Sequence, residues 1–358
     1  MLRYEDLEAA VKAGVITPAQ QAALEKQAAA RHAARPFAAG RDERFRFLRG
    51  FNDVFLSLGV VLVTGAFLTQ WSPQRDTGIG YLLAGAAVLW GVSEILVARK
   101  KAVLPGIAAV LGIGLLVSIA AGHLAWDYAY RAVKDSENLK QSLWNAPFGV
   151  WLAATGTGGL AVALYYFRFR LPFALLPMAY CLAQAVVLAV NHQLGFDRAL
   201  PLLNGISLAL GILLFTLAMR FDSSDPERLT RRADCGFWLH FAAAPFIVHP
   251  VIAMLGGGSR GGAALLTIVV VGLLGVVALI VDRRALLVSS LLYFGIAVGY
   301  LVSATAGGVG IQSTLMLTLG LLGAFVIVLG LGWHPLRSFI LSPFAGAGWL
   351  RSLPPVQK

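Results

Sequence analysis

The chain has 358 residues, of which 58% are hydrophobic and only 13% are charged, and its mean hydropathy is +0.74. Soluble domains carry about 25% charged residues, so this composition excludes a soluble protein. The formal net charge is +11, and the two cysteines, Cys181 and Cys235, lie in neither a disulfide framework nor a zinc-binding spacing.

The first 32 residues predict a small helical hairpin. Gly14 stands where a first helix would end, and Thr17 with Gln20 has the spacing of a capping box at the start of a second. We expect residues 1–32 to lie in the cytoplasm, followed by a charged linker over 33–50. The hairpin is too small to hold a core of its own. It therefore serves either as a cap on the membrane bundle or as a docking element for a cytoplasmic or membrane protein partner.

Ten apolar segments follow, each near the 20 residues that a helix needs to cross a bilayer. They cover 51–71, 79–98, 103–124, 147–167, 171–191, 199–219, 235–255, 262–281, 285–304 and 313–332. None shows the two-residue alternation of a membrane barrel. We therefore predict an all-α polytopic bundle over 51–332 with ten transmembrane helices.

The basic residues predict how the chain is threaded. With the N-terminus inside, 23 of the 29 Lys and Arg residues lie on the cytoplasmic side, as the positive-inside rule requires. Both termini are then cytoplasmic. The basic excess follows from topology, so we expect the bilayer and not nucleic acid as the partner. The use of 22 Arg against 7 Lys suggests a bacterial source and hence the inner membrane.

Two segments outside the spans are expected at the membrane surface. In the 125–146 loop, Trp126 and Tyr130 share one side of a predicted short helix on the outer leaflet. The tail, 333–358, begins with Trp333 and is rich in Gly and Pro, so we expect an interfacial cytoplasmic segment and no regular helix.

The spans contain few ionisable groups. Carboxylates in mid-membrane usually mark proton or cation coupling, and we interpret Glu94 as an anchor near the basic run 99–101. No nucleophile, metalloprotease or phosphate-loop motif is present, so we expect no enzyme activity. The sequence identifies no cofactor.

The seventh span, 235–255, contains two prolines five residues apart. Pro245 and Pro250 each remove a backbone donor, which predicts a broken helix of the kind that lines transporter sites. The alternative is a simple kink whose freed carbonyls find partners on neighbouring helices.

Polar side chains of the fifth to seventh spans, several of them near the outer ends, with Gln184 deeper and His240 in the inner third of the seventh span, predict a solute pocket. Its candidate residues are Gln184, Asn191, His192, Asn204, His240 and His249. His123, His192 and His249 are also candidate haem or metal ligands, because imidazole binds zinc, copper and iron, although their spacing matches no known metal motif.

The phrase from Leu7 to Gln20, with Gly14, Ile16 and Thr17, resembles the start of a bacterial "predicted membrane protein" family of unknown function. Members open with a short hairpin and repeat tight basic turns such as the one over 282–284. The resemblance covers the first 30 residues in sequence and the remainder in architecture. It implies a multi-span membrane fold and no particular activity.

Three functions remain open at this stage. The first is a permease-like binder or transporter of a small solute. The second is a membrane scaffold or sensor that docks a partner through residues 1–32. The third is haem or metal binding through the outer histidines.

Overall fold

A computed structural model describes residues 11, 13–24, 50–71, 78–133, 147–226, 228, 230–255, 260–305, 310–344, 346–348, 350 and 353–354. The chain divides into two compact units, one of residues 1–42 with 356–358 and one of residues 43–355. Within the described residues, ten helices are long and apolar enough to cross a membrane, which confirms the predicted all-α bundle and its span count.

The smaller unit keeps the predicted helix signals at its described residues. Gly14 has φ of 71°, and its amide donates to the Val11 carbonyl. The Gln20 amide donates to Thr17 Oγ1 at 3.2 Å, and Gln20 Oε1 accepts from the Thr17 amide at 2.8 Å. This reciprocal pair is a capping box, and it starts the helical residues 18–24. The other residues of the predicted hairpin lie outside the described part.

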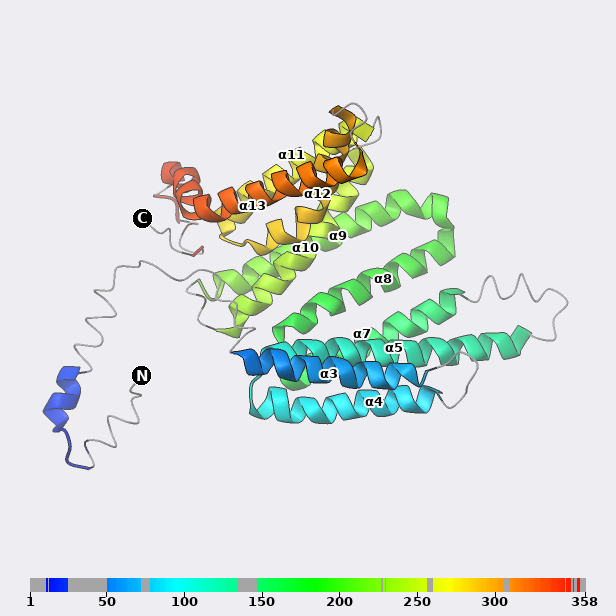
Figure 1. The fold of residues 1–358 in the computed structure, drawn as a ribbon, viewed down its shortest axis with the longest axis horizontal. Helices are drawn as coiled ribbons and strands as arrows, with labels where there is room; N and C mark the ends of the chain where they lie inside the picture. Colours follow the sequence, from blue (N-terminus) through cyan, green and yellow to red (C-terminus); the bar gives the residue numbers. More distant parts are fainter. Residues whose placement is uncertain are drawn as a thin grey trace. The chain divides into compact units, whose positions relative to one another are not determined.

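The larger unit is a bundle of antiparallel helices (Figure 1). Their bounds are α3 Phe51–Thr69, α4 Gly78–Ser93, η1 Glu94–Arg99 (a π-helical turn), α5 Val103–Val133, α7 Pro147–Phe169, η2 Pro172–Ala174, α8 Leu175–Leu194, α9 Phe196–Ser223, α10 Arg231–Leu255, α11 Arg260–Val281, α12 Ala285–Thr305, α13 Ile311–Leu341 and η3 Ser342–Phe344. Helices satisfy their backbone groups internally, which the bilayer interior demands.

The core forms three clusters. One joins α3, α4, α5 and α7; a second joins α8, α9 and α10; a third joins α10, α11, α12 and α13. Helix α10 belongs to two clusters, and its Trp238 also packs on the first. Its buried Ala242, Ala243 and Ala244 let neighbouring backbones approach closely. Helix α10 is therefore the centre of the bundle.

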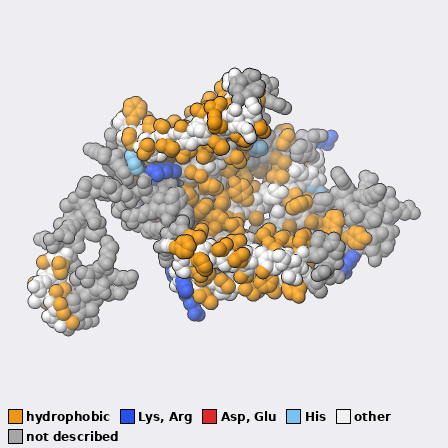
Figure 2. All heavy atoms as spheres, viewed as in Figure 1, with side chains coloured by type: hydrophobic (Ala, Val, Ile, Leu, Met, Phe, Trp, Pro, Cys, Tyr) orange, Lys and Arg blue, Asp and Glu red, His pale blue; other side chains and the backbone are white. Residues whose placement is uncertain are grey.

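The outward surface is apolar. Phe51, Ile311 and Leu331 each keep about four fifths of their surface exposed (79%, 79% and 81%). Figure 2 shows hydrophobic side chains over most of the visible helix surface, with Lys and Arg near the two ends of the bundle. Side chains of this kind face lipid in a bilayer, whereas in water they would drive aggregation.

The prediction for α10 is corrected by the structure. The helix runs without interruption from Arg231 to Leu255 and includes both Pro245 and Pro250. Pro250 frees the Phe246 carbonyl, and Ser207 Oγ of α9 donates to that carbonyl at 3.4 Å. A neighbouring helix thus supplies a donor to a freed carbonyl, as in the alternative interpretation, and the predicted break is absent.

Two surface segments are also corrected. Helix α5 continues to Val133, so Trp126 and Tyr130 extend the third span and form no separate helix; residues 134–146 lie outside the described part. Helix α13 continues to Leu341, and Trp333 is buried, with 1% of its surface exposed. The tail is helical there because Trp333 and Arg337, one turn apart, both bond to groups at the end of α11.

Candidate functional site

The turns at one end of the bundle share an unusual backbone. Lys101, Arg170, Arg228 and Asp282 have φ of 57°, 52°, 55° and 59°. The left-handed region is where glycine usually ends a helix. Here longer polar residues take that place, between α4 and α5, α7 and α8, α9 and α10, and α11 and α12. We call this the basic end of the bundle, at the left of Figure 1.

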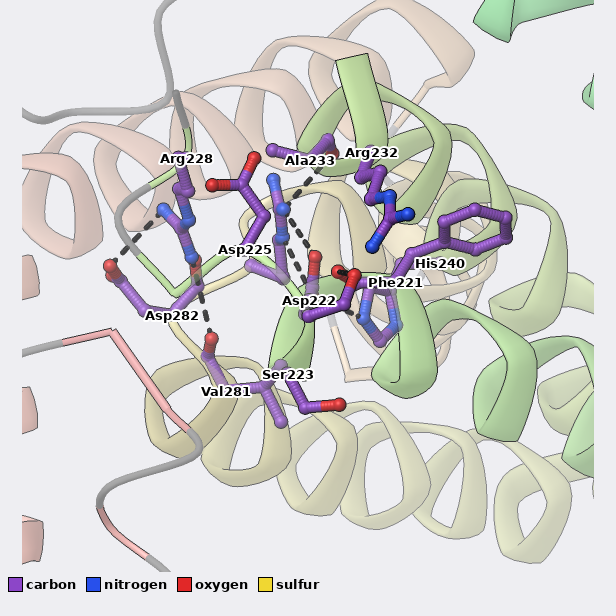
Figure 3. A network of polar contacts seen from close by, with 12 residues as sticks. Phe221, Asp222, Ser223, Asp225, Arg228, Arg232, Ala233, His240, Val281 and Asp282 are labelled. Carbon is purple, nitrogen blue, oxygen red and sulfur yellow. Dashed lines mark hydrogen bonds and ion pairs between the residues drawn. The ribbon is translucent and has the colours of Figure 1, made fainter. Parts of the chain in front are cut away.

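A buried charged cluster lies beneath two of these turns (Figure 3). Asp222 of α9, His240 of α10 and Arg283 of the α11–α12 turn have at most 2% of their surface exposed. Arg283 donates to Asp222 twice, from Nε to Oδ2 at 3.0 Å and from Nη2 to Oδ1 at 2.5 Å. His240 Nε2 lies 3.0 Å from Asp222 Oδ2. We call these three residues the buried triad.

The triad stabilises the Asp222 carboxylate, which lies at an unfavourable position near a helix C-terminus. Asp222 lies in the last turn of α9, where the helix dipole disfavours negative charge. The bidentate guanidinium of Arg283 opposes that dipole, and the same group also donates from Nη2 to the Ala233 carbonyl at 3.0 Å. Because an ionised carboxylate only accepts, His240 carries its proton on Nε2. Its Nδ1 has no hydrogen-bond partner in the described part of the chain.

Glycine makes room for the triad. A Cβ built on Gly236 of α10 would collide with Asp222 Oδ1 and would lie 3.4 Å from the Ala218 carbonyl oxygen. The carboxylate therefore sits directly against the α10 backbone. A side chain at position 236 is incompatible with this arrangement.

A second layer surrounds Asp282. Trp333 Nε1 of α13 donates to Asp282 Oδ1 at 2.7 Å, and Arg228 Nη1 lies 3.2 Å from Asp282 Oδ2. Arg337 donates from Nε to the Leu279 carbonyl at 3.1 Å and from Nη2 to the Pro354 carbonyl at 2.6 Å. These bonds connect α13 and the chain end to the α11–α12 turn.

Helix α10 begins with a side-chain cap at the same end, where Thr230 Oγ1 accepts from the Arg232 amide at 3.2 Å. Asp225 Oδ2 accepts from the Thr230 amide at 2.8 Å and from Thr230 Oγ1 at 2.7 Å. The triad, the Asp282 layer and this cap together fix the positions of α9 to α13 at the basic end.

A cavity of about 370 Å³ lies at the same basic end, where Lys101 and Arg170 are among its lining residues. Three segments far apart in sequence line it: the turn between η1 and α5, the turn between α7 and α8, and the first turns of α10. Its lining residues are Val97, Ala98, Lys101, Ala102, Val103, Arg168, Phe169, Arg170, Leu171, Pro172, Phe173, Arg231, Asp234 and Trp238. Four of these are basic and one is acidic, and the rest are apolar or aromatic.

The cavity walls are held by specific contacts. Arg168 Nη2 donates to Glu94 Oε2 at 2.6 Å, so Glu94 anchors α7 to η1 through Arg168. The Phe173 ring meets the Trp238 ring edge to face, with centroids 4.8 Å apart. The Arg170 guanidinium lies over the Tyr166 and Phe167 rings, at 5.9 and 5.8 Å from their centroids.

The structure separates the predicted outer pocket residues. Gln184 and His249 are exposed on the bundle surface, and Asn191 and Asn204 are half-buried. His192 stacks on Phe148 of α7 at 3.9 Å, whereas His249 is nearest to Tyr293 of α12, with centroids 6.3 Å apart. His240 belongs to the buried triad at the opposite end of α10. Among the described residues, no hydrogen bond, ion pair or ring contact joins any two of these six candidates.

The predicted histidine ligands are likewise divided among different neighbours. His123 lies 3.7 Å from Asp127 and edge-on to Trp71, away from the ring partners of His192 and His249. The described residues contain no group of three or more His, Cys, Asp or Glu side chains that could hold a metal ion. The metal alternative therefore has no assembled ligand set in this part of the chain.

Sequence reasoning missed Asp222, Arg283, Trp333 and Arg337. All four had been assigned to cytoplasmic surfaces by their positions near span ends. A signal for Trp333 was available, since the apolar pattern of α13 continues to that residue, whereas Pro335 after it is a typical helix-stop signal that the structure overrides.

The basic end of the bundle thus combines a buried charged triad with an amphipathic cavity. Of these two features, the triad is occupied by its own side chains, whereas the cavity offers space to a ligand. No protein-family model, curated protein or solved structure matches this chain.

Proposed function

We propose that this membrane protein binds a small solute at its basic, cytoplasmic end, as a permease does in its inward-facing state. The observation that carries the proposal is the 370 Å³ cavity lined by both the first helical cluster and α10. Ligand sites are commonly concave, mostly apolar and furnished with a few convergent polar groups. Here those groups are the basic side chains of the turns.

The position of the cavity supports a transport role. Its walls come from two sources. One is the first core cluster, of α3, α4, α5 and α7, which we call the α3–α7 cluster, and the other is α10, the helix that packs on α8, α9, α11 and α12. A site between two groups of helices can open first to one side of the membrane and then to the other when one group moves against the other. The buried triad belongs to the group that contains α10. It would keep α9, α10 and the α11–α12 turn together as one body during such a motion.

Cysteine accessibility tests the proposal. Ala98 lines the cavity, and Cys181 and Cys235 can be replaced by Ser to provide a background without native thiols. We expect Ala98→Cys to react with a membrane-impermeant maleimide in inside-out vesicles and to be shielded in right-side-out vesicles. Leu115→Cys, on the exposed surface of α5 at mid-span, is the matched control and should not react in either. Absence of Ala98→Cys labelling from both sides would contradict an open cavity.

A second candidate function is partner docking by the N-terminal unit. Residues 1–42 form a compact unit distinct from the bundle, with its own capping box. Deletion of 1–42 should leave membrane insertion intact and remove a co-purifying partner. Unchanged co-purification would refute docking through this unit.

A further inference from the structure

We infer that the cavity at the basic end binds a phosphate monoester, either on a soluble solute or on the headgroup of a lipid. This inference rests on the proposed function and specifies its ligand. It starts from the charges that line the cavity. Lys101, Arg168, Arg170 and Arg231 contribute four positive charges, and Asp234 contributes one negative charge.

The available charge matches a dianion. Glu94 forms an ion pair with Arg168, which neutralises one of the four. Among the described residues, no carboxylate lies within ion-pair distance of Lys101, Arg170 or Arg231. With Asp234 counted, the cavity keeps a net charge near +2. A phosphate monoester carries about −1.5 to −2 at pH 7, whereas a monocarboxylate or a phosphodiester carries about −1.

The donor types also favour phosphate. Lys101, Arg170 and Arg231 are the basic lining groups outside the Arg168–Glu94 ion pair. Two of them are guanidinium forks, which bind phosphate oxygens in a bidentate manner, and the third is a compact ammonium. The left-handed backbone at Lys101 and Arg170 places these two side chains on turns that reach the cavity from separate helix pairs. Three donors from three segments suit the three terminal oxygens of a monoester.

The apolar part of the lining indicates which kind of group a bound phosphate would carry. Val97, Val103, Leu171, Phe173 and Trp238 form an apolar wall beside the basic groups. An organic substituent would lie against that wall, so inorganic phosphate alone would fill only part of the site. Basic pockets between helices on the cytoplasmic side also suit anionic lipid headgroups. The two sources share the phosphate chemistry and differ in whether acyl chains are needed.

Calorimetric titration of the full-length protein in an uncharged detergent distinguishes the two. Glycerol 3-phosphate probes a soluble source and dihexanoyl phosphatidic acid probes a lipid source. Succinate controls for dianionic charge, and dihexanoyl phosphatidylcholine controls for acyl chains. We expect binding of at least one phosphate monoester and weaker binding of both controls. Binding of glycerol 3-phosphate assigns the soluble source, and binding of phosphatidic acid alone assigns the lipid.

Charge variants locate the site. Arg231→Gln and Arg170→Gln should each weaken phosphate binding by roughly tenfold or more, the loss of one charge-assisted hydrogen bond. Lys100→Gln is the matched control, because Lys100 is exposed in the same turn as Lys101 but does not line the cavity. If either arginine variant fails to elute as a folded protein, Lys101→Gln replaces it.

Several results would overturn the inference. They are no binding of either phosphate, succinate binding as tightly as glycerol 3-phosphate, or equal weakening by Lys100→Gln. With any of these, labelling of Ala98→Cys from the cytoplasmic side would leave the proposed cavity function standing. Failure of that labelling would instead refute the proposed function itself.

Discussion

The buried triad should behave as a coupled unit in stability measurements, and Arg283→Met tests this. The substitution removes two hydrogen bonds to the Asp222 carboxylate, at 3.0 and 2.5 Å, and one to the Ala233 carbonyl at 3.0 Å. Among the described residues, it leaves the buried Asp222 carboxylate with His240 as its hydrogen-bond partner. Hydrogen bonds to charged groups contribute about 1.5–3 kcal/mol each, and breaking one side of a buried pair lowers stability by about 3–5 kcal/mol. We expect a loss in that range.

The decisive comparison is between the stability of a double variant at positions 222 and 283 and that of the two single variants. Asp222→Asn alone should also destabilise the protein, because it replaces the carboxylate to which the buried Arg283 guanidinium donates two hydrogen bonds by a neutral amide. In Asp222→Asn/Arg283→Met neither charge remains, so the loss should be smaller than the sum of the single losses by at least about 2 kcal/mol. Reversible unfolding in mixed micelles, driven by sodium dodecyl sulfate, measures all three variants.

An exposed ion pair provides the control for this cycle. Arg168 and Glu94 form a close pair of 2.6 Å, but their side chains keep 53% and 35% of their surface exposed. Water screens such pairs, so Arg168→Met should lower stability by no more than about 1 kcal/mol. Additive losses in the triad, or an Arg283→Met loss as small as that of Arg168→Met, would refute the view that the triad is a desolvated, coupled cluster.

Two further predictions concern the same end of the bundle. Gly236→Ala should destabilise the protein by about 1–3 kcal/mol, because its methyl group collides with the Asp222 carboxylate. Gly272→Ala is the control: outside its own stretch of helix backbone, no heavy atom lies within 4 Å of the added Cβ, so it should be neutral or stabilising by up to about 1 kcal/mol. A stable Gly236→Ala protein in the same micelle assay would contradict the packing described. Trp333→Phe keeps an aromatic ring but removes the 2.7 Å hydrogen bond to Asp282 Oδ1. We expect the free energy of unfolding to fall by about 1–3 kcal/mol and the chain after position 333 to be cleaved at a lower protease concentration. Unchanged stability and protection would show that the bond does not hold α13 in place.

The buried triad and the cavity have different relations to the proposed activity. The triad is filled by its own side chains and offers no space to a ligand, so its role is to hold helices α9, α10 and the α11–α12 turn together. The cavity lies where this group meets the α3–α7 cluster. Substitutions in the triad should therefore change stability first, and those in the cavity should change binding first.

Local patterns were sufficient for the features that depend on nearby residues. The ten spans follow from the length of uninterrupted apolar sequence, because the bilayer thickness sets the length of a helix directly. The capping box of Thr17 and Gln20 and the helix end at Gly14 follow from three-residue spacing and backbone sterics. The tight turns could also be placed, since each separates two apolar runs by only a few charged residues.

Tertiary packing decided which distant residues pair with each other, how α10 is completed and where the candidate site lies. Asp222 and Arg283 are 61 positions apart, and no local pattern shows that one neutralises the other. The chain alone likewise gives no sign that Ser207 supplies a donor for the carbonyl freed by Pro250, so a predicted break became a continuous helix. The candidate site moved from outer histidines to a basic cavity for the same reason. Side chains share a site only when helices from distant parts of the chain pack together, and that packing is set by contacts between helices, which hydropathy along a single chain does not encode.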